Sequence, residues 1–243
     1  MAGKKIRAVF FDVDDTLLSF SGSVRETMKS GFEFFGLPPY RESMFPVFDR
    51  INKGLWRQLE EGKMTFEELI AVRWDRIFAE LDVSFDGKRF ERYFRERLFD
   101  SAVLEPGAVE TLERLRGKFT LCVASNGPCA QQLNRLRLGG LDGYFSHFFI
   151  SERLGATKPD AGFFERAFAE LRESGLDLLP EEALMVGDSR SSDIAGGKAF
   201  GMKTCLYAGA VEKEAECTGL ADYVISGLGE LAGILLPGTA ENN

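Results

Sequence analysis

The chain has 243 residues, of which 44% are hydrophobic and 28% are charged, and its formal net charge is −8. This length suits one large domain or a domain with an insert, and the composition is that of an ordinary globular protein. The acidic balance argues against a nucleic-acid partner, because proteins that bind nucleic acids usually present a basic face. The single histidine, His147, excludes multi-histidine metal sites, and it excludes histidine-dependent catalytic triads unless it serves in one itself. His147 stands beside an apolar run and is expected to begin a strand.

The sequence predicts a cytoplasmic protein with no membrane partner. Its first apolar run stops at Asp12, too early for a signal peptide, and no stretch reaches the ~18 apolar residues that span a bilayer. The cysteines form no C-x-x-C pair and are expected to be reduced thiols; they are Cys122, Cys129, Cys205 and Cys217. The sequence makes no prediction about the oligomeric state.

Short apolar runs alternate with helical patterns at the start of the chain and again after residue 106. Strands are expected at 6–11, 119–124, 148–151, 183–186, 203–207 and 223–225. Helices are expected between them at 107–116, 128–138, 162–173 and 193–200. This alternation predicts an α/β fold with a doubly wound parallel sheet. The tail from Pro237 is expected to be frayed.

The segment between the first two strands has helical periodicity and no strand pattern. A loop is expected at 16–22, followed by helices at 24–36, 43–61, 65–81 and 87–98. Thr65 and Glu68 form the signature of a capping box at the start of the third helix. We therefore expect an inserted helical bundle at 21–100, within a core made of 1–20 and 101–243.

Polar residues follow four of the expected strands. The first strand ends in the run 12–16 (Asp-Val-Asp-Asp-Thr), and the second ends in 125–127 (Ser-Asn-Gly). Lys158 follows the third strand, and Asp188 and Asp193 follow the fourth. All of these residues should meet, because parallel strands place their carboxyl ends on one edge of the sheet. Four acids against one lysine leave an excess of about three negative charges, which indicates a bound cation.

Each of these signals also has a simpler interpretation. Asp12 and its neighbours can be an ordinary helix N-cap after a strand, since Asp and Thr are good caps. Ser125 and Asp193 can likewise be caps, and Lys158 can be a surface residue.

The four motifs, in this order, resemble those of the haloacid dehalogenase (HAD) superfamily of phosphohydrolases. The family's D-x-D-x-T is found at 12–16, its Ser at 125, its Lys at 158 and its acidic motif at 187–193. The resemblance spans residues 6–210 and implies a Rossmann-like core with the insert as a helical cap domain. Asp15 departs from the glycine that many members have at this position.

The resemblance implies a phosphatase that depends on Mg²⁺ and acts through an aspartyl-phosphate. Asp12 would be the nucleophile, a known use of carboxylates. Asp14 would protonate the leaving alkoxide and then activate water. Thr16 would brace the loop rather than react.

The remaining motif residues would bind the phosphate and the metal. Ser125, Asn126 and Gly127 would hold the phosphoryl oxygens, and Lys158 would balance the charge of the acids and the phosphoryl group. Mg²⁺, which prefers oxygen ligands, would be ligated by the carboxylates of Asp12 and Asp188 and the backbone carbonyl of Asp14. Asp193 would orient Lys158 or a metal-bound water.

Three other functions share parts of this pattern. A 2-haloacid dehalogenase displaces halide without acid–base catalysis and typically lacks the second acid, Asp14. A signalling receiver domain also gathers acids and a lysine around Mg²⁺, but it is about half this length. A phosphomutase uses the same core and would need a bisphosphorylated activator.

The expected partner is a small phosphorylated metabolite: a nucleotide, a sugar phosphate or phosphoglycolate. The run 51–57 resembles caps of the 5′-nucleotidase-like branch. Trp56 would stack on a base or sugar, and Arg57 or Arg73 would hold a second anionic group. Trp56 can equally be part of the core of the cap.

Overall fold

The computed structural model describes residues 5–209, 219 and 221–236. Cys217 and the tail from Pro237 lie outside the described residues. The chain divides into two compact units: unit 1 is residues 1–19 and 104–243, and unit 2 is residues 20–103. The domain boundaries expected from the sequence, after residues 20 and 100, are close to these, whereas the role of unit 2 as a cap stays a prediction.

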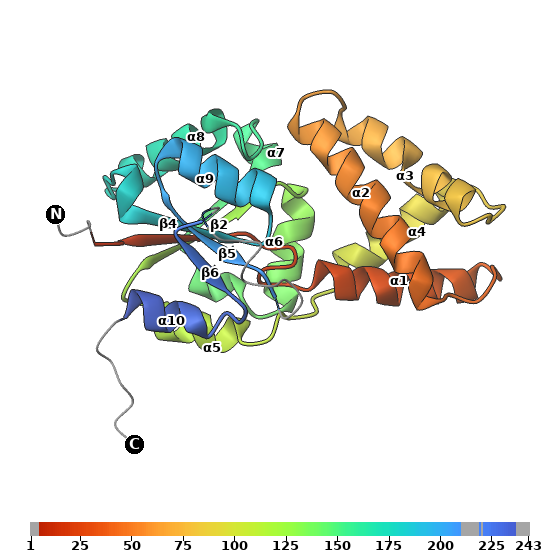
Figure 1. The fold of residues 1–243 in the computed structure, drawn as a ribbon, viewed down its shortest axis with the longest axis horizontal. Coiled ribbons are helices and arrows are strands. Elements are labelled where there is room, and N and C mark those ends of the chain that lie inside the picture. Colours follow the sequence, from red (N-terminus) through yellow and green to blue (C-terminus); the bar gives the residue numbers. More distant parts are fainter. Residues whose placement is uncertain (1–4, 210–218, 220, 237–243) are drawn as a thin grey trace, which may run out of the picture. The chain divides into compact units, whose positions relative to one another are not determined.

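Unit 1 is built on a parallel sheet with the strand order β3-β2-β1-β4-β5-β6 (Figure 1). The described strands are β1 (Ala8–Phe11), β2 (Thr120–Ser125), β3 (His147–Ile150), β4 (Ala183–Gly187), β5 (Lys203–Tyr207) and β6 (Tyr223–Ile225). Phe11 at the end of β1 pairs with Val123 on one side and Val186 on the other. The strand order reverses beside β1, so the predicted doubly wound sheet is confirmed.

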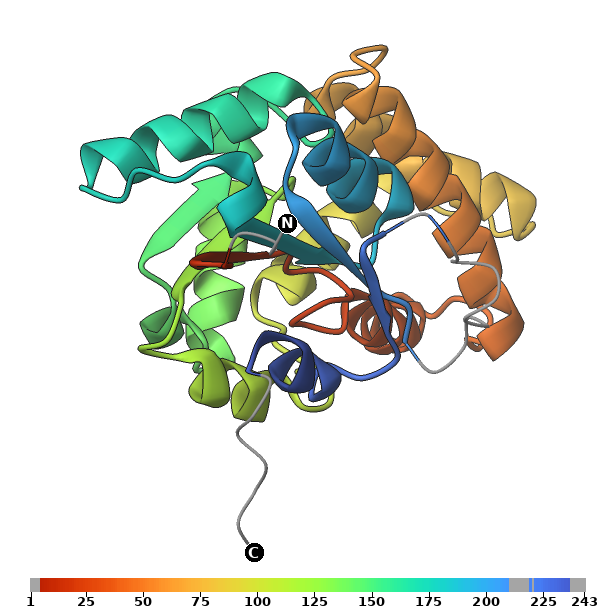
Figure 2. The same cartoon turned by 60° about the vertical axis from the view of Figure 1, so that its left-hand side comes forward.

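Helices cover both faces of this sheet (Figures 1 and 2). They are α5 (Ala108–Leu115), α6 (Cys129–Leu138), α7 (Ser151–Leu154), α8 (Ala161–Glu173), α9 (Ala195–Phe200) and α10 (Glu230–Leu235), with single turns η2 (Asp142–Tyr144) and η3 (Pro180–Glu182). Successive residues of β1 point to opposite faces, as strand geometry requires. Val9 and Phe11 pack in the core that includes α5, α6 and α10, whereas Ala8 and Phe10 pack in the core that includes α8. All four side chains are fully buried, so the strand that leads to Asp12 is held from both sides.

Unit 2 consists of helices around an aromatic core. Its described elements are α1 (Phe20–Phe34), η1 (Glu42–Met44), α2 (Phe45–Glu60), α3 (Phe66–Glu80) and α4 (Gly87–Phe99). The Trp74 ring centroid lies 5.6 Å from that of Phe48 and 4.2 Å from that of Phe90. The capping box at Thr65 and Glu68 is present with both hydrogen bonds. Each of the four expected helices is found.

The structure differs from the sequence prediction at two helix starts. Helix α1 begins at Phe20, inside the stretch expected to be a loop, because Phe20 packs against the unit 2 core and its ring lies 6.3 Å from that of Phe48. Tertiary packing of this kind outweighs the low helix propensity of Ser and Gly. Before α9, residues Arg190–Ile194 form a π-helical turn, η4, so Asp193 lies in this turn and not at the start of a regular helix. The short helices α7 and α10 were not predicted.

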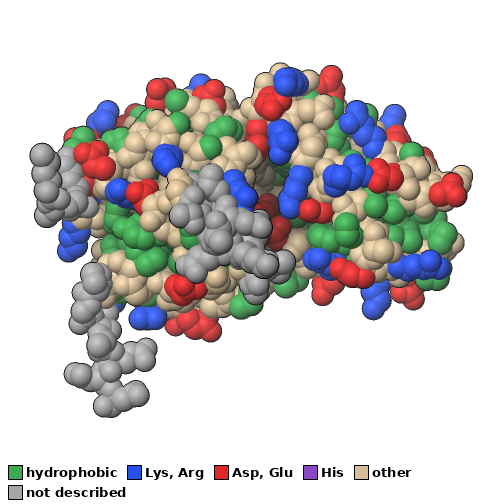
Figure 3. Space-filling view, viewed as in Figure 1, with side chains coloured by type: hydrophobic (Ala, Val, Ile, Leu, Met, Phe, Trp, Pro, Cys, Tyr) green, Lys and Arg blue, Asp and Glu red, His purple; other side chains and the backbone are tan. Residues whose placement is uncertain are grey.

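Charges of both signs are interspersed on the face of the molecule shown in Figure 3. On unit 2, Arg50 pairs with Glu80, and Lys53 pairs with Asp49 at 2.9 Å. Among the described residues, no helix has both the length and the apolar character needed to cross a membrane.

Candidate active site

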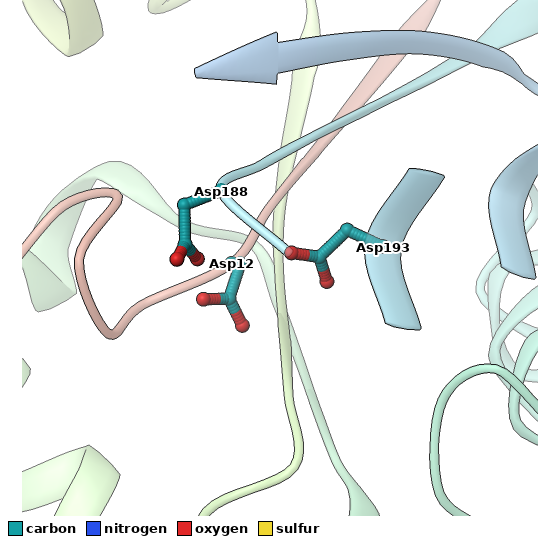
Figure 4. Close-up of side chains that lie close together, drawn as sticks. All are labelled: Asp12, Asp188 and Asp193. Carbon is teal, nitrogen blue, oxygen red and sulfur yellow. The ribbon is translucent and has the colours of Figure 1, made fainter. Parts of the chain in front are cut away.

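Three acids gather at the carboxyl edge of the sheet in unit 1. Asp12 directly follows β1, where its backbone N–H donates to the Val186 carbonyl at 2.9 Å, and Asp188 directly follows β4. Asp193 comes from the turn η4, and its carboxylate reaches back toward the end of β4 (Figure 4). One carboxylate oxygen from each acid lies within 4.8 Å of the others. The structure thus brings together the acids of the first and last motifs.

Lys158 lies between two of these acids. Its side chain is 1% exposed, and its Nζ donates to Asp12 Oδ1 at 2.8 Å and to Asp193 Oδ1 at 2.6 Å. The third N–H donates to the Ala124 carbonyl at 2.6 Å, so all three donors of the ammonium are used. Burial would lower the pKa of Lys158, but the charges of the two acids outweigh it and raise that pKa. Lys158 is therefore a buried cation and not a surface residue.

Asn126 fixes the backbone at Lys158. Its Nδ2 donates to the Lys158 carbonyl at 2.8 Å, and its Oδ1 accepts from the Lys158 N–H at 2.8 Å. This pair of bonds ties the loop that carries the lysine to the end of β2. The Asn126 side chain thus positions Lys158, while its predicted backbone contact with phosphate stays a prediction.

Asp14 and Ser125 belong to a second network, which contains two residues that the sequence analysis missed. Gln132 Nε2 donates to Asp14 Oδ2 and to Ser125 Oγ, both at 2.8 Å, and Arg135 donates to Asp14 Oδ1. Ser125 also accepts from the Gly127 N–H at 3.1 Å. Ser125 is the last residue of β2, and Pro128 is the N-cap residue of α6, so Ser125 is not the cap of that helix.

A signal for Gln132 and Arg135 was present in the sequence. In α6 they lie three residues apart, on the same helix face as Leu136, which is buried. Both side chains are fully buried. Polar residues on the apolar face of a helix need buried partners, and the acids at the sheet edge supply them.

The charges explain why this edge is suited to a cation. Burial raises the pKa of Asp12 to about 8, against the opposing charge of Lys158, and the charges of Asp193 and Asp14 add to the rise. Burial and the charge of Asp12 likewise raise the pKa of Asp188 well above its usual range. Arg135 adds a second positive charge, so the expected negative excess falls from about three to about two. The carboxylates still repel one another, and a divalent cation would relieve that repulsion.

The donor set fits Mg²⁺, which takes oxygen ligands. Both oxygens of Asp193 are engaged, one by Lys158 and the other by the Ser189 N–H at 3.1 Å. Asp12 and Asp188 remain as the carboxylates that could hold the ion, and their role as ligands stays a prediction. The Asp14 carboxylate is held by Gln132 and Arg135 of α6, and the contact predicted for its backbone carbonyl stays a prediction.

The loop after Asp14 is held by its backbone. Asp15 has a left-handed φ of 54°, which explains why a glycine is also suited to this position. The Thr16 N–H donates to the Val13 carbonyl at 3.4 Å, and its hydroxyl has no hydrogen-bond partner among the described residues. Any bracing by Thr16 therefore comes from its backbone.

The predicted specificity residues lie in unit 2, and one of them does not suit its predicted role. Arg73 is 4% exposed and donates to Glu91 at 2.5 and 3.0 Å and to Asn52 at 3.0 Å. Its charge is balanced by Glu91 inside unit 2 and is not offered to a ligand. Trp56 is half-buried, with its ring centroid 6.0 Å from that of Phe66, and Arg57 is exposed. Their contact with substrate stays a prediction.

His147 takes no part in the site. It is the first residue of β3 and pairs with Cys122, whereas the acids lie beyond the carboxyl ends of the strands. Burial lowers the pKa of His147. The expectation that it begins a strand is confirmed.

The chain matches known proteins over most of its length. Residues 6–201 match the model of the haloacid dehalogenase-like hydrolases. The HAD hydrolase YfnB of Bacillus subtilis is 34% identical over 202 residues, which are 83% of this chain and 84% of YfnB. Its crystal structure bound to magnesium has a TM-score of 0.85 at 33% identity and covers 96% of this chain and 99% of that chain. The chain therefore belongs to the haloacid dehalogenase-like hydrolase family.

Two relatives in the same family are named for an activity. The pyrimidine 5′-nucleotidase PynA of Streptococcus pneumoniae is 32% identical over 203 residues, which are 82% of each chain. The glyceraldehyde 3-phosphate phosphatase of Pyrococcus furiosus is 32% identical over 239 residues, covering 96% of this chain and 94% of that protein.

Proposed function

We propose that the chain is a Mg²⁺-dependent phosphohydrolase of a small phosphorylated metabolite and that it acts through an aspartyl-phosphate on Asp12. The chain is a phosphoric monoester hydrolase, because it belongs to a family in which its relatives include a nucleotidase and a phosphatase. The observation that carries the mechanism is the contrast between its two first-motif acids. Asp12 is buried against Lys158, whereas the Asp14 side chain is 31% exposed and held by Gln132 and Arg135. Two carboxylates in different surroundings suit two different roles.

In the first half of the reaction, a carboxylate oxygen of Asp12 attacks the phosphorus atom, and the bond from phosphorus to the ester oxygen breaks. Asp14 delivers a proton to that departing oxygen, so the alcohol leaves neutral. Lys158 lies beside Asp12 and balances negative charge at the attacking carboxylate. Mg²⁺ held by Asp12, Asp188 and the Asp14 carbonyl would offset the charge of the phosphoryl oxygens.

In the second half, Asp14 takes a proton from water, and the water oxygen attacks the phosphorus of the aspartyl-phosphate. Inorganic phosphate leaves, and the Asp12 carboxylate is restored. Halide displacement needs no second acid, so the buried partners that hold Asp14 favour the phosphatase over the dehalogenase.

The substrate class is tested by measuring phosphate release from a panel of metabolites with Mg²⁺ and with excess chelator. The panel should include a pyrimidine nucleoside monophosphate and glyceraldehyde 3-phosphate, because these are the compounds for which the two relatives are named. We expect turnover of at least one member, lost with chelator and lost in Asp12→Asn. The matched control is Asp177→Asn, since the Asp177 side chain is 78% exposed and lies in a surface ion pair. Full turnover in chelator would contradict the role of the metal, and turnover by Asp12→Asn would contradict the nucleophile.

A further inference from the structure

Gln132 lies where two parts of the proposed mechanism meet. It is on α6, and its side chain is fully buried. A buried amide without hydrogen bonds is strongly unfavourable, because it has given up its bonds to water. The position is therefore stable only because the amide is bonded, and its partners are Asp14, Ser125 and Arg135.

Every polar group of this amide has a partner. Its Nε2 donates to Asp14 Oδ2 and to Ser125 Oγ at 2.8 Å each, and its Oε1 accepts from Arg135 at 3.1 Å. A guanidinium can only donate, so Arg135 requires the amide oxygen on its own side. The amide nitrogen must then face Asp14 and Ser125. Arg135 thus fixes the orientation of the Gln132 amide, with its nitrogen toward Asp14 and Ser125.

Gly127 leaves the space that this arrangement needs. A Cβ atom at residue 127 would lie 2.6 Å from Gln132 Nε2 and 2.7 Å from its Cδ, which is closer than such atoms can approach. Any larger residue would push the amide away from Ser125. The glycine also supplies the N–H that donates to Ser125 Oγ at 3.1 Å.

These contacts orient the hydroxyl of Ser125. A serine oxygen has two acceptor positions and one O–H donor. Both acceptor positions are taken, one by the Gly127 N–H and the other by Gln132 Nε2. The hydroxyl proton is therefore left to donate to a third group, and a phosphoryl oxygen is an acceptor of the right kind.

We propose that Gln132 is a positioning residue that couples phosphate binding to proton transfer, by holding the Ser125 hydroxyl as a donor and the Asp14 carboxylate in place. This inference rests on the proposed function and adds two residues to it, Gln132 and Arg135. One amide bonded to both groups fixes them relative to each other, so loss of its two donors disturbs binding and chemistry together.

The test compares two substrates in Gln132→Met, which keeps the length of the side chain and removes the donors. An alkyl phosphate needs a proton at its leaving oxygen, whereas an activated aryl phosphate needs little. Loss of the groups that hold metal ligands typically costs roughly 10–100-fold in activity, and by analogy we expect a loss of that size in kcat/KM for the alkyl phosphate. The loss for the aryl phosphate should be clearly smaller, and inorganic phosphate should inhibit more weakly than in the wild type.

Two further variants make the result specific. Gly127→Ala leaves Gln132 unchanged but displaces its amide, so it should change the ratio of the two substrates in the same direction. Gln131→Met, one residue along the same helix, is the matched control and should keep the wild-type ratio. If Gln132→Met fails to fold, the ratio in Gly127→Ala decides.

Equal losses for both substrates, or wild-type kinetics, would overturn the role of Gln132 while leaving the proposed function intact. Turnover by Asp12→Asn in the same series would instead overturn the proposed function, and this inference with it.

Discussion

Lys158 is the only positive group bonded to Asp12 among the described residues, and its removal should be costly. In Lys158→Met, the carboxylates of Asp12 and Asp193 lose their common partner while they stay 12% and 0% exposed. Removal of one partner from a buried ion pair costs about 3–5 kcal/mol. For a protein of this size, that loss corresponds to a fall in Tm of roughly 6–20 °C. This loss is a large fraction of the free energy of unfolding of a typical domain, which is roughly 5–15 kcal/mol.

The deficit should also depend on pH. The pKa of Asp12 is already raised to about 8 in the folded chain, and loss of the lysine charge would raise it further. An acid whose folded pKa exceeds its unfolded value of about 3.9 loses stability as the pH rises between those two values. The wild type already bears this loss up to about pH 8, so the additional deficit of the variant should develop above that pH. The two proteins should therefore be closest in stability at about pH 6 and furthest apart at about pH 9.

Thermal unfolding in chelator, followed by circular dichroism at both pH values, measures this deficit. Tryptophan fluorescence gives a separate signal for unit 2, because both tryptophans, Trp56 and Trp74, lie there. The control is Lys203→Met, which breaks a surface pair with Asp222 whose side chains are 45% and 29% exposed; such pairs contribute about 0–1 kcal/mol. A deficit in Lys158→Met no larger than that of the control at about pH 9 would refute the reasoning.

The apparent affinity for Mg²⁺ should rise from about pH 6 to pH 8, because Asp12 must lose a proton to bind the ion. Titration calorimetry measures this affinity, and a constant value over that pH range would contradict the prediction. Glu91→Leu should destabilise unit 2 by about 3–5 kcal/mol, measured by tryptophan fluorescence, because it leaves Arg73 buried without its partner. The double variant Arg73→Met with Glu91→Leu should regain most of the lost stability. Equal losses in the single and double variants would argue against a buried pair. Gly187→Ala should cost about 1–3 kcal/mol in denaturant unfolding, because the added Cβ meets the buried carboxylate of the last motif. Gly143→Ala, which adds a Cβ in open space, should have little effect, and similar losses in both variants would refute the clash.

Much of unit 1 was predictable because β1 and β4 are short, fully buried and followed by polar motifs. The run at 8–11 is apolar on both faces, as a central parallel strand must be, and the structure places it between β2 and β4. The parallel arrangement then required Asp12 and Asp188 to meet at one edge. Their convergence follows from topology alone.

Other features depended on tertiary contacts that a linear pattern does not reveal. The helical spacing of Gln132 and Arg135 indicates a buried face, but their partners Asp14 and Ser125 come from other elements and are known only from the structure. Arg73 carries a charge that suits an anion, but its partner Glu91 lies on another helix, 18 positions away. The start of α1 was set by the packing of Phe20 and not by the propensities of its first turn.

The nucleophile is the central claim, and trapping of the covalent intermediate tests it most directly. The enzyme is mixed with a labelled aryl phosphate and Mg²⁺, quenched in acid, and analysed for phosphate bound to the peptide that contains Asp12. In Asp14→Asn, Asp12 can still attack the substrate, but the base for the second step is missing. This variant should therefore accumulate labelled aspartyl-phosphate. Asp12→Asn should show no label and no turnover. Label or turnover in Asp12→Asn, with none in Asp14→Asn, would show that the roles of the two acids are reversed.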